Sequence, residues 1–282
     1  FFFQAHHPIY QFACVFQNLA QGITHYMIDE LEPDEEFHVV RFTTMAKEYL
    51  KEIYAAGKIP IIAGGTGFYI QALLYDIDFT EQQCDEAYRR QLEEQAKEHE
   101  AGYLHEMLRK VDPASAEAIH ANNVKRVIRA LEFYHLSGQK ISEHNETERQ
   151  KQSPYNFAYF VLNDERAKLY ERIDKRVDAM IEAGLVNEVQ KLKDMGCSRE
   201  MVSMQGLGYK EVLAYLDGEY TLEEAVYIIK RETRHFAKRQ LTWFKRERDV
   251  IWLDKQTFGY DDAAILTDMI SILQEKEIIS HE

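Results

Sequence analysis

Residues 57–74, with the sequence GKIPIIAGGTGFYIQALL, decide the fold that this chain is expected to adopt. The apolar run Ile59–Ala63 is rich in branched side chains and precedes a pair of glycines, a pattern typical of a buried parallel strand. A third glycine follows, and Phe68–Leu74 has the apolar spacing of a helix. The stretch therefore predicts a strand, a tight glycine turn and a helix in succession.

A glycine turn of this kind has two interpretations. Gly64, Gly65 and Gly67 allow the backbone to approach a ligand closely, and Thr66 adds a hydroxyl at the centre of the turn. The helix that follows directs free N–H groups and its positive end toward an anion. The alternative is an ordinary connection between a strand and a helix, in which the glycines serve only the turn.

The segments before this stretch extend the same α/β order. Residues 22–31 predict a turn and a short strand. Phe37–Ala56 has apolar positions at a period of about 3.6, which predicts an amphipathic helix that Gly57 ends. Strands that alternate with helices indicate a parallel α/β sheet.

The composition changes after Phe79, where residues 80–150 predict helices and no strand. We therefore expect two domains. The first is an α/β core of residues 1–79 and 153–282, and the second is an inserted helical domain of residues 80–152. The helices expected in the insertion are Glu86–Val111, Pro113–Ala121 and Val124–Ser137.

The α/β pattern resumes after the insertion. Thr221 and Glu224 predict a capping box at the start of a long helix, and Asp164 is expected to cap the first helix of this part. The other expected elements are a strand at Phe157–Leu162, a helix ending near Met195, a turn at Met201–Gly208, a helix at Tyr209–Leu216, a strand at 249–253 and a helix at Ile265–Ile279.

Charge and cysteine content limit the classes of function. The net charge of −14 argues against a general affinity for nucleic acid, but residues 230–248 hold eight Lys or Arg against two Glu. No apolar run approaches the roughly 20 residues that span a bilayer, so no membrane partner is expected. Cys14, Cys84 and Cys197 form no CxxC pair, which favours a reducing compartment and no zinc module. We expect a cytoplasmic protein.

The basic segment predicts a helix with two different faces. Arg231, Arg234, Lys238 and Lys245 fall on one side of the helical wheel, while apolar residues such as Trp243 fall on the other. Like charges repel one another along such a face, which favours a polyanionic partner such as a phosphate group or nucleic acid. A plain surface helix is the alternative.

A second cationic group stands at the start of the helix within Asn122–Ala130. Lys125, Arg126 and Arg129 lie in its first two turns, where they oppose the helix dipole. An RNA backbone would satisfy these charges together with the free N–H groups of the helix. Salt bridges to nearby acidic residues are the alternative.

Two arginines one helical turn apart, Arg172 and Arg176, form a third group. Their guanidinium groups can hold a diphosphate bidentately. They can equally pair with carboxylates of the same helix, namely Glu171, Asp174 and Asp178.

Six segments together resemble one family, the bacterial tRNA dimethylallyltransferases, or isopentenyl-diphosphate:tRNA transferases. The segments are HYMIDELEPDEEF, GKIPIIAGGTGFYIQALL, IHANNVKRVIRALE, RIDKRVDAMIEAGLVNEV, MQGLGYKEVLAYLDG and RHFAKRQLTWF. They keep the order and approximate spacing of the family from Gly22 to about Trp252. Each segment alone is weak evidence, but the set is specific.

The resemblance implies a fold and a reaction. It implies a P-loop NTPase-like parallel sheet core with an inserted helical domain that grips the anticodon arm of tRNA. It implies transfer of a dimethylallyl group from dimethylallyl diphosphate to the exocyclic amine of the adenosine 3′ to the anticodon, with Mg²⁺ at the diphosphate and the base flipped from its stack. A monomer is expected.

The resemblance also implies roles for individual residues. Thr66 matches a position at the reaction centre, where it contacts the RNA, and Arg176, Gly64 and Gly65 match the diphosphate site. The positions that match tRNA contacts are Thr66, Arg89, Lys125, Arg126, Arg129, Gln205, Gly208, Lys210, Arg234, Lys238 and Arg239.

The chain departs from the family pattern before Gly22. The sequence contains no GxxxxGK[ST] loop, and residues 1–21 contain no Asp to match the family's base, although Gln4 stands near the Gln of its DSxQxY segment. Without an initiator Met or a signal-peptide pattern, we expect a processed, truncated or incomplete N-terminus; a frame error and removed residues remain alternatives. We expect a poor or inactive catalyst that still binds tRNA. A non-catalytic tRNA-binding remnant and a P-loop nucleotide phosphotransferase are the alternative functions.

Overall fold

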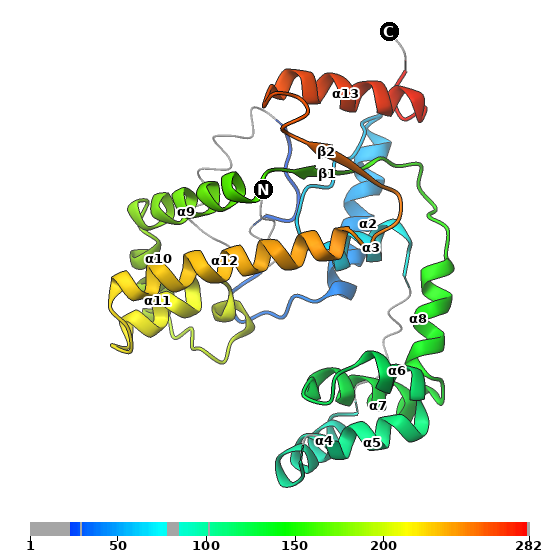
Figure 1. The fold of residues 1–282 in the computed structure, drawn as a ribbon, viewed down its shortest axis with the longest axis vertical. Helices are drawn as coiled ribbons and strands as arrows, with labels where there is room; N and C mark the ends of the chain where they lie inside the picture. Colours follow the sequence, from blue (N-terminus) through cyan, green and yellow to red (C-terminus); the bar gives the residue numbers. More distant parts are fainter. Residues whose placement is uncertain (1–22, 29, 78–84, 101, 281–282) are drawn as a thin grey trace. The chain divides into compact units, whose positions relative to one another are not determined.

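The structure is a computed structural model that describes residues 23–28, 30–77, 85–100 and 102–280 (Figure 1). The expectations for residues 1–22, including Gln4 and Cys14, and for Cys84 lie outside these residues. The chain divides into two compact units. The first consists of the described residues up to Leu73 and those from Tyr155 onward, and the second is Leu74–Pro154. None of the helices in these described ranges is long and apolar enough to cross a membrane.

The sheet of the first unit consists, in the described residues, of two parallel strands. Strand β1 (Tyr159–Asn163) pairs with β2 (Val250–Asp254), with Tyr159 beside Val250 and Asn163 beside Asp254. The strands expected at Phe157–Leu162 and 249–253 are thus confirmed, each displaced by one or two residues. Parallel strands require a long crossover, and helices α9 to α12 lie between them in the chain.

Two other strand predictions are wrong. Ile59–Ala63 pairs with no strand in the described part of the chain, and Ile61 is 89% exposed. The described residues of 22–31 contain no strand either. A β-strand is stabilised by a hydrogen-bonded neighbour, and among the described residues β1 and β2 pair only with each other.

The helices of the first unit agree well with the sequence pattern. They are α2 (Val39–Ala55), α3 (Gly67–Leu74), α9 (Arg166–Glu182), α10 (Leu185–Asp194), α11 (Tyr209–Leu216), α12 (Leu222–Phe244) and α13 (Asp262–Glu275), with a 3₁₀ turn, η1, at Val202–Gln205. The capping box of α12 is confirmed, because the Thr221 hydroxyl accepts from the Glu224 N–H at 3.2 Å and the Glu224 carboxylate accepts from the Thr221 N–H at 2.8 Å.

Helices α9 to α12 enclose the larger core of the first unit (Figure 1). Val189, Met204 and Val212 are completely buried there. The same core contains a polar pair, in which the Tyr209 hydroxyl donates a short hydrogen bond to the Glu188 carboxylate. Burial raises the pKa of Glu188 above its ordinary value, against the opposing effect of this hydrogen bond.

This buried carboxylate predicts a pH dependence of stability. A raised pKa in the folded state means that stability from Glu188 is present at acidic pH and is lost as the pH rises through the folded pKa. Glu188→Gln keeps an acceptor for Tyr209 and cannot ionise. We expect it to unfold like the parent chain near pH 4 and to be about 1 kcal/mol more stable at pH 8.

Urea unfolding at a series of pH values measures this difference. Glu182→Gln is the matched control, because Glu182 is exposed at the end of the neighbouring helix α9. Equal stability of the parent and the Glu188→Gln variant at pH 8 would contradict the prediction.

Helices are the only regular secondary structure in the described residues of the second unit. Its helices are α4 (Glu86–Glu98), α5 (Gly102–Val111), α6 (Pro113–Ala118), α7 (Val124–Ser137) and α8 (Ile141–Gln150). The single helix expected at Glu86–Val111 is therefore wrong, because the backbone becomes extended at His99, where α4 ends. Helix α7 has the expected bounds, and Gly138 ends it in the left-handed conformation with φ of 68°.

A buried carboxylate connects three helices of this unit. Asp112 is completely buried and is the N-cap of α6, where it accepts hydrogen bonds from the N–H and hydroxyl of Ser115 at 3.0 and 2.6 Å. It also accepts from the N–H and hydroxyl of Ser142 in α8, at 3.0 and 2.6 Å. Because Asp112 directly follows α5, one side chain fixes the relative positions of α5, α6 and α8.

The two ends of the second unit meet. The Ser153 hydroxyl donates a short hydrogen bond to the Leu74 carbonyl oxygen, and the Lys151 ammonium donates to the Asp76 carbonyl oxygen at 3.3 Å. The chain therefore enters and leaves this unit at neighbouring points.

Candidate functional site

The glycine turn lies against the C-terminal half of α12. The Gln240 side-chain amide donates a hydrogen bond to the Gly65 carbonyl oxygen at 2.7 Å. A Cβ atom on Gly65 would lie 2.1 Å from Gln240 Nε2, and one on Gly67 would lie 2.2 Å from Trp243 Cδ1. Gly65 could carry a side chain only if the flexible end of Gln240 moved, whereas at Gly67 the rigid Trp243 ring would have to move, so the close approach of α12 restricts Gly67 more than Gly65.

Further contacts extend this packing along α3. The rings of Phe68 and Trp243 meet edge to face, with centroids 6.2 Å apart, and Gln71 donates to the Glu247 carboxylate at 3.3 Å. Thr66 lies between the two glycine contacts and is partly buried. Its carbonyl oxygen accepts from the N–H groups of Tyr69 and Ile70 in the first turn of α3.

The two glycines predict different responses to a methyl group. Gly67→Ala places its Cβ against the Trp243 ring, which Phe68 holds from another side, and overpacking of this kind costs about 1–3 kcal/mol. Gly65→Ala displaces only the flexible end of Gln240, so we expect a loss of about 1 kcal/mol or less, the value of one hydrogen bond. Thermal unfolding of the two variants measures the difference, and an equal loss in both would contradict it.

Two cations of α12, Lys230 and Arg234, form ion pairs with α9. Arg234 donates to both carboxylate oxygens of Asp174 at 2.6 and 2.8 Å, and Lys230 pairs with Asp178 at 2.6 Å. The expected cationic face is therefore neutralised in part. Lys238 and Lys245 are exposed and have no ion pair within the described ranges.

Arg239 completes this part of α12. It is exposed and its guanidinium lies 5.6 Å from the centre of the Phe236 ring, a cation–π distance. Lys238 and Arg239 are thus adjacent exposed cations about one helical turn beyond the Arg234–Asp174 pair.

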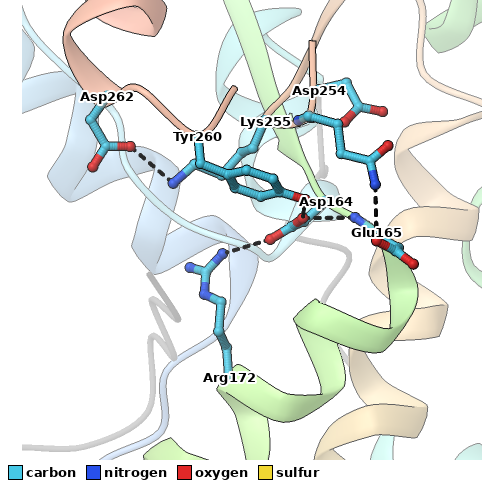
Figure 2. A network of polar contacts seen from close by, with 8 residues as sticks. Asp164, Glu165, Arg172, Asp254, Lys255, Tyr260 and Asp262 are labelled. Atoms are coloured by element: carbon cyan, nitrogen blue, oxygen red, sulfur yellow. Dashed lines mark hydrogen bonds and ion pairs between the residues drawn. The ribbon is translucent and has the colours of Figure 1, made fainter. Parts of the chain in front are cut away.

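The two arginines of α9 have different surroundings. Arg172 donates to the Asp164 carboxylate at 3.3 Å, which Figure 2 shows, and not to any of the carboxylates that the sequence pattern offered. Those carboxylates pair elsewhere: Glu171 with Lys175, Asp174 with Arg234 and Asp178 with Lys230. Burial lowers the pKa of Arg176, because the surrounding protein removes water from its guanidinium.

Asp164 is not the cap of α9, contrary to the sequence prediction. Glu165 is the N-cap, and the Asp164 carboxylate accepts from the Glu165 N–H at 2.8 Å and from the Tyr260 hydroxyl at 3.2 Å (Figure 2). Gln256 donates to Glu165 at 2.9 Å, and Lys168 lies 3.8 Å above the centre of the Tyr260 ring. This network joins the residues that follow β1 to those that follow β2.

The loop from η1 to α11 brings three predicted residues together. Gln205 donates long hydrogen bonds to the carbonyl oxygens of Arg199 and Glu200, at 3.4 and 3.5 Å. Gly208 has a left-handed φ of 98°, and its N–H donates to the buried Glu211 carboxylate at 2.8 Å. Lys210 lies 3.5 Å from the same carboxylate.

In the second unit, the cations at the start of α7 are exposed. Neither an ion pair nor a hydrogen bond with a side chain of the described part of the chain involves Lys125, Arg126 or Arg129. The N-cap, Asn123, makes no side-chain hydrogen bond to the helix. The alternative of local salt bridges is thus not observed for these three side chains.

Arg89 lies on α4 of the same unit and is already engaged. Its guanidinium holds the Glu132 carboxylate of α7 bidentately, at 2.7 and 2.8 Å, and this carboxylate is buried. A buried carboxylate needs such a partner, so Arg89 has a structural task besides any contact with RNA.

No group of three or more His, Cys, Asp or Glu side chains that could hold a metal is found in the described ranges. These residues provide no preformed site for Mg²⁺, so we assign none of them to the ion that the resemblance implies. Mg²⁺ is often held by few protein ligands together with substrate phosphates. The use of Mg²⁺ by this chain stays a prediction.

Comparisons with known proteins agree with the resemblance. A family model described as IPP transferase matches residues 14–247. A tRNA dimethylallyltransferase from Lachnoclostridium phytofermentans is 62% identical over 259 residues, which are 92% of this chain and 82% of that protein.

Two solved structures are also similar. The tRNA isopentenylpyrophosphate transferase of Bacillus halodurans has a TM-score of 0.65 and 38% identity, covering 99% of this chain and 87% of its own. A eukaryotic dimethylallyltransferase described as acting on tRNA has a TM-score of 0.72 and 26% identity, covering 89% of this chain and 65% of its own. They confirm the predicted fold class, a P-loop NTPase-like α/β core with a helical insertion.

Proposed function

Because the chain belongs to the IPP transferase family, we propose that it transfers a dimethylallyl group from dimethylallyl diphosphate to tRNA. The acceptor is the exocyclic amine of the adenosine 3′ to the anticodon. The amine nitrogen forms a bond to C1 of the dimethylallyl group, the bond from C1 to the diphosphate oxygen breaks, and the amine gives one proton to a base, for which residues 1–21 hold no Asp to match that of the family. Diphosphate leaves with the electron pair of the broken bond.

One observation carries this proposal. The identity of 62% with a tRNA dimethylallyltransferase extends over 92% of this chain and includes both units. A nucleotide phosphotransferase has no such support.

The surface of α7 supports the RNA part of the proposal. Lys125, Arg126 and Arg129 are three exposed cations at a helix start whose backbone N–H groups are uncapped by a side chain. Phosphate oxygens of an RNA strand accept from both kinds of donor. Because this contact is local, the net charge of −14 does not oppose it. The η1–α11 loop and the exposed cations of α12 extend the proposed RNA contacts in the first unit.

The first unit supports the diphosphate part. Arg176 lies on α9, two residues after Asp174, and its guanidinium has the donor geometry to hold a diphosphate bidentately. The turn of Gly64 and Gly65 carries backbone N–H groups, and the adjacent Thr66 adds a hydroxyl. Donors of this kind stabilise the negative charge that develops on the departing diphosphate. When bound, Mg²⁺ would supply further charge stabilisation there.

Label transfer from radiolabelled dimethylallyl diphosphate to an unmodified anticodon stem-loop, with Mg²⁺ present, tests the proposal. Label on the adenosine 3′ to the anticodon, and none on a control stem-loop with guanosine at that position, would support the proposal and contradict the expectation of a poor or inactive catalyst. Binding of the stem-loop without transfer would instead support a non-catalytic tRNA-binding protein. Phosphorylation of a nucleotide without any affinity for RNA would overturn the proposal.

A further inference from the structure

We propose that Gln240 and Trp243 of α12 are positioning residues that hold the glycine turn and thereby fix the position of Thr66. Neither residue is among those that the family resemblance marks as a site residue. For its effect on catalysis the inference rests on the proposed function, whereas its effect on the turn itself does not.

The two contacts lie on either side of Thr66. Gln240 binds the Gly65 carbonyl oxygen at 2.7 Å, and the Trp243 ring covers Gly67 so closely that a Cβ atom there would lie 2.2 Å from the ring. Thr66 is the single residue between them. A backbone held on both sides of one residue leaves that residue little freedom to move.

The Trp243 indole is in an unusual state. Its Nε1 atom is buried and has no hydrogen-bond partner among the residues that the structure describes. A buried N–H group without a partner costs free energy, of the order of 1–3 kcal/mol, and side chains that only fill space rarely keep such a group. The ring nevertheless lies with Nε1 2.4 Å from the position of a Gly67 Cβ atom. This arrangement favours close contact with the turn over hydrogen bonding of the indole.

Helix α12 contacts both α9 and the glycine turn. Its Arg234 is bound to Asp174 of α9, two residues before Arg176 in the same helix, while Gln240 and Trp243 bind the glycine turn. One rigid helix therefore carries the contacts to both elements. The distance from the diphosphate residue Arg176 to Thr66 is set through α12.

The consequence for the reaction is specific. A reacting group that is displaced by about 1 Å can lose on the order of a hundredfold in rate, although substrate binding at other surfaces is unchanged. Release of the turn should therefore lower kcat, while the KM for tRNA, which depends on many phosphate contacts, should remain nearly constant.

The variant Gln240→Met tests this directly, since Met has a similar length and flexibility but no donor for the Gly65 carbonyl oxygen. Thr267→Ala is the matched control, because it also removes one hydrogen bond from a side chain to a backbone carbonyl, at the exposed face of α13. We expect Gln240→Met to lower kcat between about tenfold and a hundredfold with a KM for tRNA within about twofold of the parent. Thr267→Ala should leave both constants unchanged.

A second measurement does not depend on activity. Trp252→Phe leaves Trp243 as the only tryptophan of the chain, so its fluorescence reports on the glycine turn. In this background we expect Gln240→Met to make Trp243 more accessible to acrylamide quenching, and Thr267→Ala to have no effect.

The outcomes separate the two proposals. Unchanged quenching of Trp243 in Gln240→Met overturns the inference, and so does an unchanged kcat. A parent chain that transfers no label contradicts the proposed function, while the quenching comparison still decides whether Gln240 holds the turn. An equal fall in kcat and melting temperature in Gln240→Met and Thr267→Ala would show a general loss of stability and would also overturn the inference.

Discussion

An anticodon stem-loop is expected to bind at least about 30-fold more weakly to the triple variant Lys125→Ala, Arg126→Ala, Arg129→Ala than to the parent chain at moderate salt. The three cations are exposed, and no described carboxylate competes for them, so their attraction is available to RNA phosphates. Each phosphate contact releases condensed counterions from the RNA. The plot of log affinity against log salt should therefore become less steep by about 2–3.

Fluorescence anisotropy of a labelled stem-loop at several salt concentrations measures both quantities. The matched control is Arg90→Ala, Arg109→Ala, Lys110→Ala, which removes the same charge from exposed positions of the same unit. Arg90 and Arg109 are paired with Glu86 and Glu106, so their loss should weaken binding only slightly. If both triple variants lose affinity to the same degree, net charge and not the α7 surface attracts the RNA.

The variant Asp112→Ala is expected to destabilise the helical unit by about 3 kcal/mol or more. The substitution removes the N-cap of α6 and all four hydrogen bonds to Ser115 and Ser142, and it leaves buried N–H groups without partners. Asp112→Asn should cost less than Asp112→Ala, because the amide oxygen still accepts from one of the two backbone N–H groups. It should still lower stability, because the other N–H then faces the NH₂ group.

Urea unfolding followed by circular dichroism measures these losses. Asp85→Ala is the control, because Asp85 is the half-exposed N-cap of α4, where it accepts from the Tyr88 N–H at 3.0 Å and lies 3.5 Å from His135 Nε2. It should cost about 1 kcal/mol. A loss in Asp112→Ala no larger than in Asp85→Ala would show that the connection to α8 contributes nothing.

The same carboxylate should make stability depend on acid. Burial by itself raises the pKa of Asp112, but the hydrogen bonds from Ser115 and Ser142 outweigh it, and the net pKa lies below the ordinary value. A lowered folded pKa means that this contribution is present above the unfolded pKa and is lost as the pH falls through the folded pKa. Asp112→Asn should lack this loss below about pH 4.

Local signals explain which elements could be predicted from the sequence. The predicted bounds of α7 and α11 are correct because each helix contains an apolar stripe and a glycine adjoins one end, Gly138 after α7 and Gly208 before α11. The family, too, was predicted from short segments, and the comparisons confirm it. The strand at Ile59–Ala63 was wrong because β structure depends on a neighbour elsewhere in the chain, which the segment cannot specify.

The contacts that hold the candidate site in place could not be predicted from the sequence, for the same reason. The sequence placed Trp243 on the packing side of its helix, yet nothing in it indicates that Gly67 is what the ring covers, 176 residues away. Asp112 before Pro113 carries the signal of a helix N-cap, which could have been recognised. Its second partner, Ser142, has no signal of its own. The individual roles of the site residues stay predictions.

The meeting of Leu74 and Ser153 bears on how such a protein can acquire a second unit. Because the entry and exit points of the insertion are in contact, the rest of the fold needs no wider opening than an ordinary surface loop would need. Contacts inside the insertion offset the entropy cost of bringing its two ends together. The helical unit can therefore be gained, lengthened or exchanged during evolution as a module. A short Gly-Ser bridge in place of residues 75–153 should leave a host that still folds.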